Sequence, residues 1–206
     1  DGDPDAGFMA PPGTYSVTLA KRVDGRVTEL AGPVSFEVVR VFEGALEGMS
    51  PEQTAAFMQR VAALQRAVSA ASQSVSLAFS TVELLEKALK RSTVDPGTLD
   101  TELEVFKQEL YEIDMAMNGN SSRRAMSEPI SPTISSRLRV AAGSDGRSDY
   151  GPTAMHQRAF EIATDEFATI GLQLRRLLET ELPALEAKFE DAGVPWTPGR
   201  PLPHVN

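Results

Sequence analysis

The fold is decided by residues 50–91, which read SPEQTAAFMQRVAALQRAVSAASQSVSLAFSTVELLEKALKR. Ser50 before Pro51, with Gln53 three residues after the serine, is typical of a helix start closed by a capping box. The apolar positions that follow are Phe57, Val61, Leu64, Val68, Ala71, Val75, Ala78, Val82, Leu85 and Leu89. They alternate steps of four and three residues, which is the heptad spacing of a helix that packs along its whole length. We predict one helix about 60 Å long, at 1.5 Å per residue.

A second helix is predicted to begin at Asp95-Pro96 and to end at Asn118-Gly119-Asn120. It carries the same spacing at Leu99, Leu103, Phe106, Leu110, Ile113 and Met117. Residues 118–131 are polar and poor in large apolar groups, and we interpret them as a mobile loop.

A short helix is predicted for PTISSRLRVAA, which starts at Ser131-Pro132 and is stopped by Gly143 in the polar turn GSDGRSDYG. The last helix is predicted to begin near Pro152-Thr153. Its apolar positions are Phe160, Ala163, Phe167, Ile170, Leu174 and Leu177, then Leu182, Leu185 and Phe189. Pro183 lies inside this pattern, where it removes a backbone hydrogen bond, so we expect a bend.

Three short strands are predicted near the N-terminus. Residues 14–19 alternate polar and apolar side chains, which indicates a strand with one buried face. Asp24-Gly25 predicts a hairpin turn, and residues 27–30 form the returning strand. We interpret Gly32-Pro33 as a break and residues 34–41 as a third strand.

The elements together predict a mainly α-helical chain. We expect an elongated antiparallel bundle of three long helices plus one short helix, with a small antiparallel β appendage that is part of a β-sandwich. The expected divisions are residues 1–44 for the β appendage, 45–193 for the helical bundle and 194–206 for an extended proline-rich tail. The absence of an initiator methionine favours a processed product or a piece of a longer protein.

Composition excludes several classes of partner. The net charge of −9 repels phosphate backbones, so nucleic acid is not expected as a partner. No apolar run is long enough to cross a bilayer, so no direct membrane insertion is expected. The chain has no cysteine, which excludes disulfides and thiolate metal sites. Asp1, Asp3 and Asp5 lack the glycine and glutamate positions of a calcium loop.

No catalytic, cofactor-binding or metal-binding set is predicted, and no cofactor is expected. A Gly-x-Ser-x-Gly motif is absent, and His156 lies in the first turn of a predicted helix. Carboxylates are numerous on the second and last helices, at Glu102, Glu104, Glu109, Glu112, Asp114, Glu161, Asp165 and Glu166. No glutamate stands three residues before either histidine, as a di-metal bundle requires, so we interpret these carboxylates as a solvated face. Phe57, Phe79, Phe106, Phe160, Phe167 and Phe189 are expected in the core.

Three residues are candidate contacts with another protein. Trp196 lies in the proline-rich tail, where it either fastens the tail to the bundle or anchors in a partner. Arg123 and Arg124 either dock a partner or belong to a solvated loop.

Three stretches carry a family resemblance: PGTYSVTL with PVSFEVV, SRLRVAAGSDGRSDYGPTAMHQRAFEIATDEF, and LRRLLETELPALEAKF. They resemble the C-terminal region of bacterial secreted sortilin-like proteins with BNR-repeat β-propellers. The resemblance implies late strands of an Ig-like sandwich followed by a helical bundle, and a periplasmic or secreted location. The propeller is missing here, since no Ser-x-Asp-x-Gly-x-Thr-Trp box occurs, and any glycan-directed activity would belong to it.

We therefore expect a non-enzymatic structural or docking module of the cell envelope, as an accessory subunit on the periplasmic face of a membrane protein complex. The alternative is the accessory tail of a secreted β-propeller hydrolase or glycan-binding protein. Self-association through the heptad positions is a third hypothesis, so the oligomeric state stays open.

Overall fold

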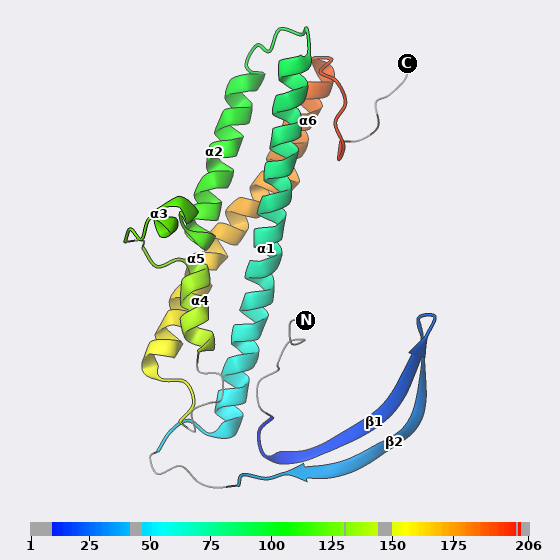
Figure 1. The fold of residues 1–206 in the computed structure, drawn as a ribbon, viewed down its shortest axis with the longest axis vertical. Coiled ribbons are helices and arrows are strands. Elements are labelled where there is room, and N and C mark those ends of the chain that lie inside the picture. The colour runs from blue at the N-terminus through cyan, green and yellow to red at the C-terminus, as the bar shows by residue number, and fades with distance from the viewer. Residues whose placement is uncertain (1–9, 42–46, 130, 144–149, 201, 203–206) are drawn as a thin grey trace.

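A computed structural model describes residues 10–41, 47–129, 131–143, 150–200 and 202. Its longest element is helix α1, Pro51–Arg91, as the sequence predicts (Figure 1). The Ser50 hydroxyl accepts a hydrogen bond from the Gln53 amide, and the Gln53 side chain accepts one from the Ser50 amide. The capping box therefore satisfies two of the amides that the first helical turn leaves without partners.

Helix α2, Leu99–Asn118, begins later than predicted. The Asp95 carboxylate accepts a hydrogen bond from the Gly97 amide, and Gly97 adopts a φ of +51°. This local turn occupies the residues that were expected to be the first helical turn, because a short polar side chain competes with the helix for backbone donors. The helix ends at Asn118 with Gly119 as its cap, as predicted.

Residues 118–131 contain a short helix that the sequence analysis missed. Helix α3, Ser121–Ala125, is capped by Asn120, whose side-chain oxygen accepts a hydrogen bond from the Arg123 amide at 3.0 Å. The interpretation of the whole stretch as a loop is wrong, because a single asparagine cap is enough to start one turn of helix. Helix α4, Ile134–Ala142, then starts from a Thr133–Ser136 capping box and stops at Gly143.

The last helical stretch is divided just before Pro183. Helix α5, Ala154–Arg176, runs into the π-helical turn η1, Leu177–Glu181, and then into helix α6, Leu182–Asp191. The Leu182 amide donates to the carbonyl of Leu177, five residues back. A π turn inserts one extra residue into a helix, which accounts for the five-residue step between these two apolar positions.

The helices share a core that follows the predicted apolar positions. Its largest fully buried side chains include Leu85, Leu110, Met117, Leu177 and Phe189. A smaller cluster at the other end joins Phe57 and Phe160, whose rings meet edge to face with centroids 5.5 Å apart. The phenylalanines expected in the core are buried or partly buried there.

The N-terminal sheet has two strands rather than three. β1, Gly13–Val23, pairs antiparallel with β2, Arg26–Val38, across the Asp24-Gly25 turn. The prediction of a separate strand over residues 34–41 is wrong, because Gly32-Pro33 lies inside β2, where the register shifts, and does not end it. Gly32 has a φ of +115°, and a Cβ there would lie 2.7 Å from the Val17 carbonyl oxygen, so only glycine fits.

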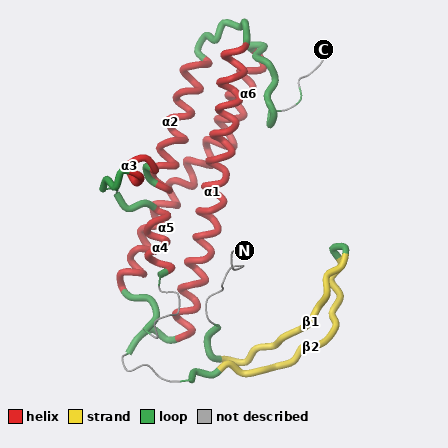
Figure 2. The backbone as a smooth tube through the Cα atoms, viewed as in Figure 1, coloured by secondary structure: helices red, strands yellow, loops and turns green. Residues whose placement is uncertain are grey.

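The prediction of a mainly helical chain with a small N-terminal antiparallel sheet is confirmed. Figure 2 separates the two parts by colour, with the helices in red and the β1–β2 hairpin in yellow. The hairpin curves away from the helices, and the extensive contacts of each strand are with the other strand.

Candidate docking surface

The β1–β2 hairpin has one apolar face that is open to solvent. The register places Tyr15 opposite Phe36 and Val17 opposite Val34, and directly opposed residues point to the same side of a sheet. The two rings of the first pair stack with centroids 6.0 Å apart. Val17, Val34 and Phe36 remain 55%, 62% and 48% exposed. We call Tyr15, Val17, Leu19, Val34 and Phe36 the hairpin apolar face.

Over residues 14–18 and 35–37, the opposite side of the hairpin is polar. Thr14, Ser16 and Thr18 alternate with the apolar residues of β1, and Ser35 and Glu37 do the same on β2. A sheet with one apolar and one polar face is the pattern of a layer that is covered on one side only. A two-stranded hairpin is marginal in water by itself, so this one needs a cover that the described residues do not supply.

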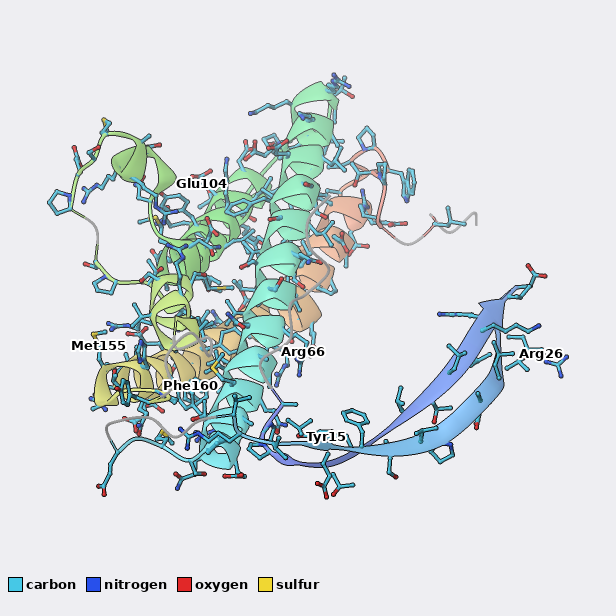
Figure 3. The ribbon with its side chains drawn as sticks, turned by 60° about the horizontal axis from the view of Figure 1, so that its bottom comes forward. Tyr15, Arg26, Arg66, Glu104, Met155 and Phe160 are labelled. Carbon is cyan, nitrogen blue, oxygen red and sulfur yellow. The ribbon has the colours of Figure 1, made fainter. Side chains whose placement is uncertain are left out.

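The turn end of the hairpin is basic. Lys21, Arg22 and Arg26 surround the turn that contains Asp24, whereas the whole chain carries a net charge of −9. Figure 3 places Arg26 at the tip of the hairpin, far from Tyr15 at the other end of the strands. The tip is therefore suited to an acidic group on the protein segment that covers the sheet.

Trp196 belongs to a folded segment, residues 194–200, which we call the C-terminal strap. Its indole N–H donates to the Arg200 carbonyl at 3.2 Å, and the residue remains 45% exposed. The Arg200 side chain is only 2% exposed and donates to the carbonyl of Pro195 and to the Glu190 carboxylate. Val194 is buried against the main core. The strap is thus fastened to α6 through Val194 and Arg200.

Arg123 and Arg124 make contacts within their own segment. The Arg123 guanidinium lies 3.7 Å from the Glu128 carboxylate, and Arg124 donates to the Asn118 carbonyl at 2.6 Å. Both are exposed on α3, which lies on the opposite side of α1 from the strap (Figure 1). The structure therefore does not bring the three predicted contact residues together into one surface.

Several of the predicted surface carboxylates join helices instead of standing alone in solvent. Glu102 of α2 accepts a hydrogen bond from Lys188 of α6 at 2.6 Å, and this bond holds the pKa of Glu102 below its ordinary value. Glu109 of α2 pairs with Arg176 of α5, and Glu166 of α5 pairs with Arg137 of α4. These three residues lie at the surface and also join neighbouring helices there.

A pair between the first two helices was also missed. Lys107 of α2 donates to Glu86 of α1 at 2.6 Å, and this hydrogen bond raises the pKa of Lys107. No sequence spacing marks such pairs, because they depend on how each helix is rotated against its neighbour.

A groove of about 540 Å³ lies between α4 and α5. Val140, Met155 and Ile162 line it, and Met155 is 65% exposed (Figure 3). The arginines at its rim, Arg137 and Arg158, are paired with glutamates. The lining is largely apolar and holds no pair of residues suited to acid–base or nucleophilic chemistry.

His156 serves the start of α5. Its Nδ1 accepts a hydrogen bond from the Thr153 amide at 3.0 Å, so the ring takes part in a capping box. Among the described residues, no group of three or more histidine or acidic side chains is arranged to hold a metal ion. In the same part of the chain, no helix is both long and apolar enough to span a membrane. Asp1, Asp3 and Asp5 lie outside the described residues.

Comparison with known proteins adds no relative. No protein-family profile, curated protein or solved structure matches this chain.

Proposed function

We propose that this chain is a non-catalytic docking module, and that the hairpin apolar face is the surface through which it joins another protein. The observation that carries the proposal is the contrast between the two parts of the chain. The predicted heptad positions of the helices are buried or partly buried, whereas Val17, Leu19, Val34 and Phe36 are each about half exposed or more. Apolar side chains gathered on one exposed face are typical of an interaction site.

The fold that best serves this role is an elongated antiparallel bundle of three long helices and one short helix, which acts as a rigid rod. The hairpin then represents the late strands of an Ig-like sandwich whose other strands come from elsewhere. The ion pairs between helices support the proposal of a rigid rod, because they join the helices at the surface in addition to the apolar contacts of the core. Trp196, Arg123 and Arg124 become secondary contacts at separate places on the rod.

For location, we propose the periplasm or the exterior of the cell, with the module as an accessory subunit on a membrane protein complex. This rests on the resemblance to secreted sortilin-like proteins and on the acidic composition. The alternative is the supporting tail of a secreted β-propeller hydrolase or glycan-binding protein. Reading the complete gene and the ends of the mature protein separates these two roles, because only the second retains propeller blades.

The test of docking compares two neighbouring positions on opposite faces of β1. Val17→Asp places a charge on the hairpin apolar face, and Ser16→Asp places the same charge on the polar face. Each full-length variant is captured from the native envelope after mild cross-linking, and the bound proteins are quantified. We expect the partner recovered with the unmodified chain to be lost with Val17→Asp and retained with Ser16→Asp. Equal recovery with both variants contradicts docking through this face, and steady turnover of a substrate by the chain alone contradicts the non-catalytic role.

A further inference from the structure

We propose that the free edge of β1 is a strand-addition site, at which an extended segment of a partner protein pairs antiparallel with residues 13–20. The apolar side chains of that segment continue the hairpin apolar face, and its acidic end lies beside Lys21 and Arg22. This inference rests on the proposed docking function and specifies the kind of segment that the hairpin binds.

Within the described part of the chain, β1 pairs with β2 alone, so the backbone groups along its outer edge have no strand beside them. A two-residue turn is closed by a hydrogen-bonded pair, here Val23 and Arg26, and the odd-numbered residues of β1 therefore direct their N–H and C=O groups toward β2. The position of the Val17 carbonyl oxygen, which faces Gly32 of β2, agrees with this. The even-numbered residues, such as Ser16 and Thr18, direct theirs to the open side. These are the donors and acceptors that an added strand uses.

The two edges of the hairpin differ in their ability to accept a strand. On β2, Gly32 and Pro33 together oppose one residue of β1, Thr18, and Leu30 is a second extra residue. Bulges and a proline, here Pro33, are the devices by which edges avoid pairing. Residues 13–20 of β1, GTYSVTLA, contain no proline, charge or bulge. The β1 edge is therefore the one left fit for pairing.

Charge defines one end of the partner segment. Lys21 and Arg22 follow directly after the uncharged stretch of β1, and Arg26 lies across the turn. A strand that runs antiparallel to β1 brings its N-terminal end to this tip. Acidic residues at that end are favoured by attraction, and basic residues there are opposed by like charge.

A second copy of this chain is poorly suited to pair with the β1 edge and cover the hairpin apolar face. Eight residues of two paired strands give a face of about 27 by 10 Å, or about 270 Å² per copy. Stable interfaces bury about 1,200–2,000 Å² in total, so stacking two hairpins falls short. Pairing β1 with β1 of a second copy instead doubles the exposed apolar face without covering it. A different protein, which supplies both a strand and a covering sheet, satisfies the edge and the face together.

The probe for this site is a labelled ten-residue peptide that begins with two aspartates and continues with alternating valine and threonine. Its binding to the full chain is followed by fluorescence anisotropy. The matched variants are Ser16→Pro and Ser35→Pro, which lie directly opposite each other and remove one outward amide from β1 or from β2. We expect the first to weaken binding at least tenfold and the second to change it less than twofold. A peptide that begins with two lysines should bind several-fold more weakly.

Equal effects of the two proline variants, or no effect of either, overturn the assignment. Because Ser16→Pro can also disturb the hairpin, hydrogen exchange of the unmodified chain provides a second readout. The peptide should slow exchange at Ser16 and Thr18 and leave Ser35 unchanged, and the reverse pattern contradicts the proposal. Sedimentation provides a further test. If the chain forms a concentration-dependent dimer that Ser16→Pro abolishes, the β1 edge pairs with a second copy, and the proposal of a different partner protein is overturned. If Val17→Asp removes the cellular partner while Ser16→Pro does not, docking through the face stands and strand addition fails.

Discussion

Tyr15 and Phe36 stack across β1 and β2 with their ring centroids 6.0 Å apart and their planes at 27°. The Tyr15 hydroxyl donates to the Pro11 carbonyl at 2.7 Å, so its polar end is satisfied by the residues just before β1. The rings belong to the hairpin apolar face, which the described helices do not cover. We therefore expect the stability of the helices to be independent of these two rings.

That separation is measurable with two phenylalanine substitutions. Phe189 is fully buried in the helical core, and Phe189→Ala should lower the free energy of unfolding by about 3–5 kcal/mol. Phe36→Ala should change the unfolding of the helices by less than about 0.5 kcal/mol. Denaturant unfolding followed by far-UV circular dichroism compares them. A similar loss in both variants would mean that the hairpin is part of the same cooperative core.

The π turn before Pro183 should make that proline nearly neutral. Because the Leu182 amide already donates five residues back and Pro183 stands in the first turn of α6, Pro183→Ala should change stability by less than about 1 kcal/mol. Ala168→Pro, in the exposed middle of α5, should cost about 3 kcal/mol or more. Thermal unfolding of the two variants tests the difference. A large loss for Pro183→Ala would show that the proline itself maintains the helix path.

The fluorescence of Trp196 reports on whether the C-terminal strap stays folded against α6. Trp196 is the only tryptophan, and the buried Arg200 guanidinium holds the loop around it. Arg200→Met should release the strap and shift the tryptophan emission to longer wavelength, with the helical circular dichroism unchanged. Arg175→Met, at an exposed position of α5, is the matched control and should leave the emission as it is. An unchanged spectrum in both variants contradicts the fastening role of Arg200.

Glu186 makes stability depend on pH in a defined direction. Its partial burial raises the pKa of the carboxyl group above 4.5, against the opposing effect of Arg200. A carboxyl group with a raised pKa binds more protons in the folded state, so its contribution to stability falls as the pH rises above 4.5. Glu186→Gln should therefore be more stable than the unmodified chain at neutral pH, and the difference should disappear below pH 4.5. A difference that is constant from pH 3 to pH 8 would rule out this origin.

The sequence predicts the helices well because their signals are local. A capping box at Ser50 and heptad spacing over residues 57–89 determine α1 without knowledge of its neighbours. The errors lie where one local signal competes with another. Gly97 delays the start of α2, Asn120 starts the unexpected α3, and Gly32-Pro33 forms a bulge where a break was expected.

The candidate site was harder to predict than the fold. Alternation in residues 14–19 correctly indicates a one-sided strand, but it does not reveal that the apolar side stays open. The salt bridges from Lys188 to Glu102 and from Arg200 to Glu190 could not be predicted, because the proximity of these residues depends on helix packing and on the path of the strap. Trp196 alone carried a signal, because a tryptophan in a proline-rich segment has to be packed somewhere.

The most direct test of the account is hydrogen exchange at the amides of β1 and β2, first in the isolated chain and then in the complex captured from the envelope. Without a partner, we expect these amides to exchange far faster than those of α1, α2 and α5, since a lone hairpin is marginal in water. In the complex, exchange at the hairpin should slow by orders of magnitude while the helices stay unchanged. Hairpin amides that are as protected in the isolated chain as those of the helical core would contradict the docking role.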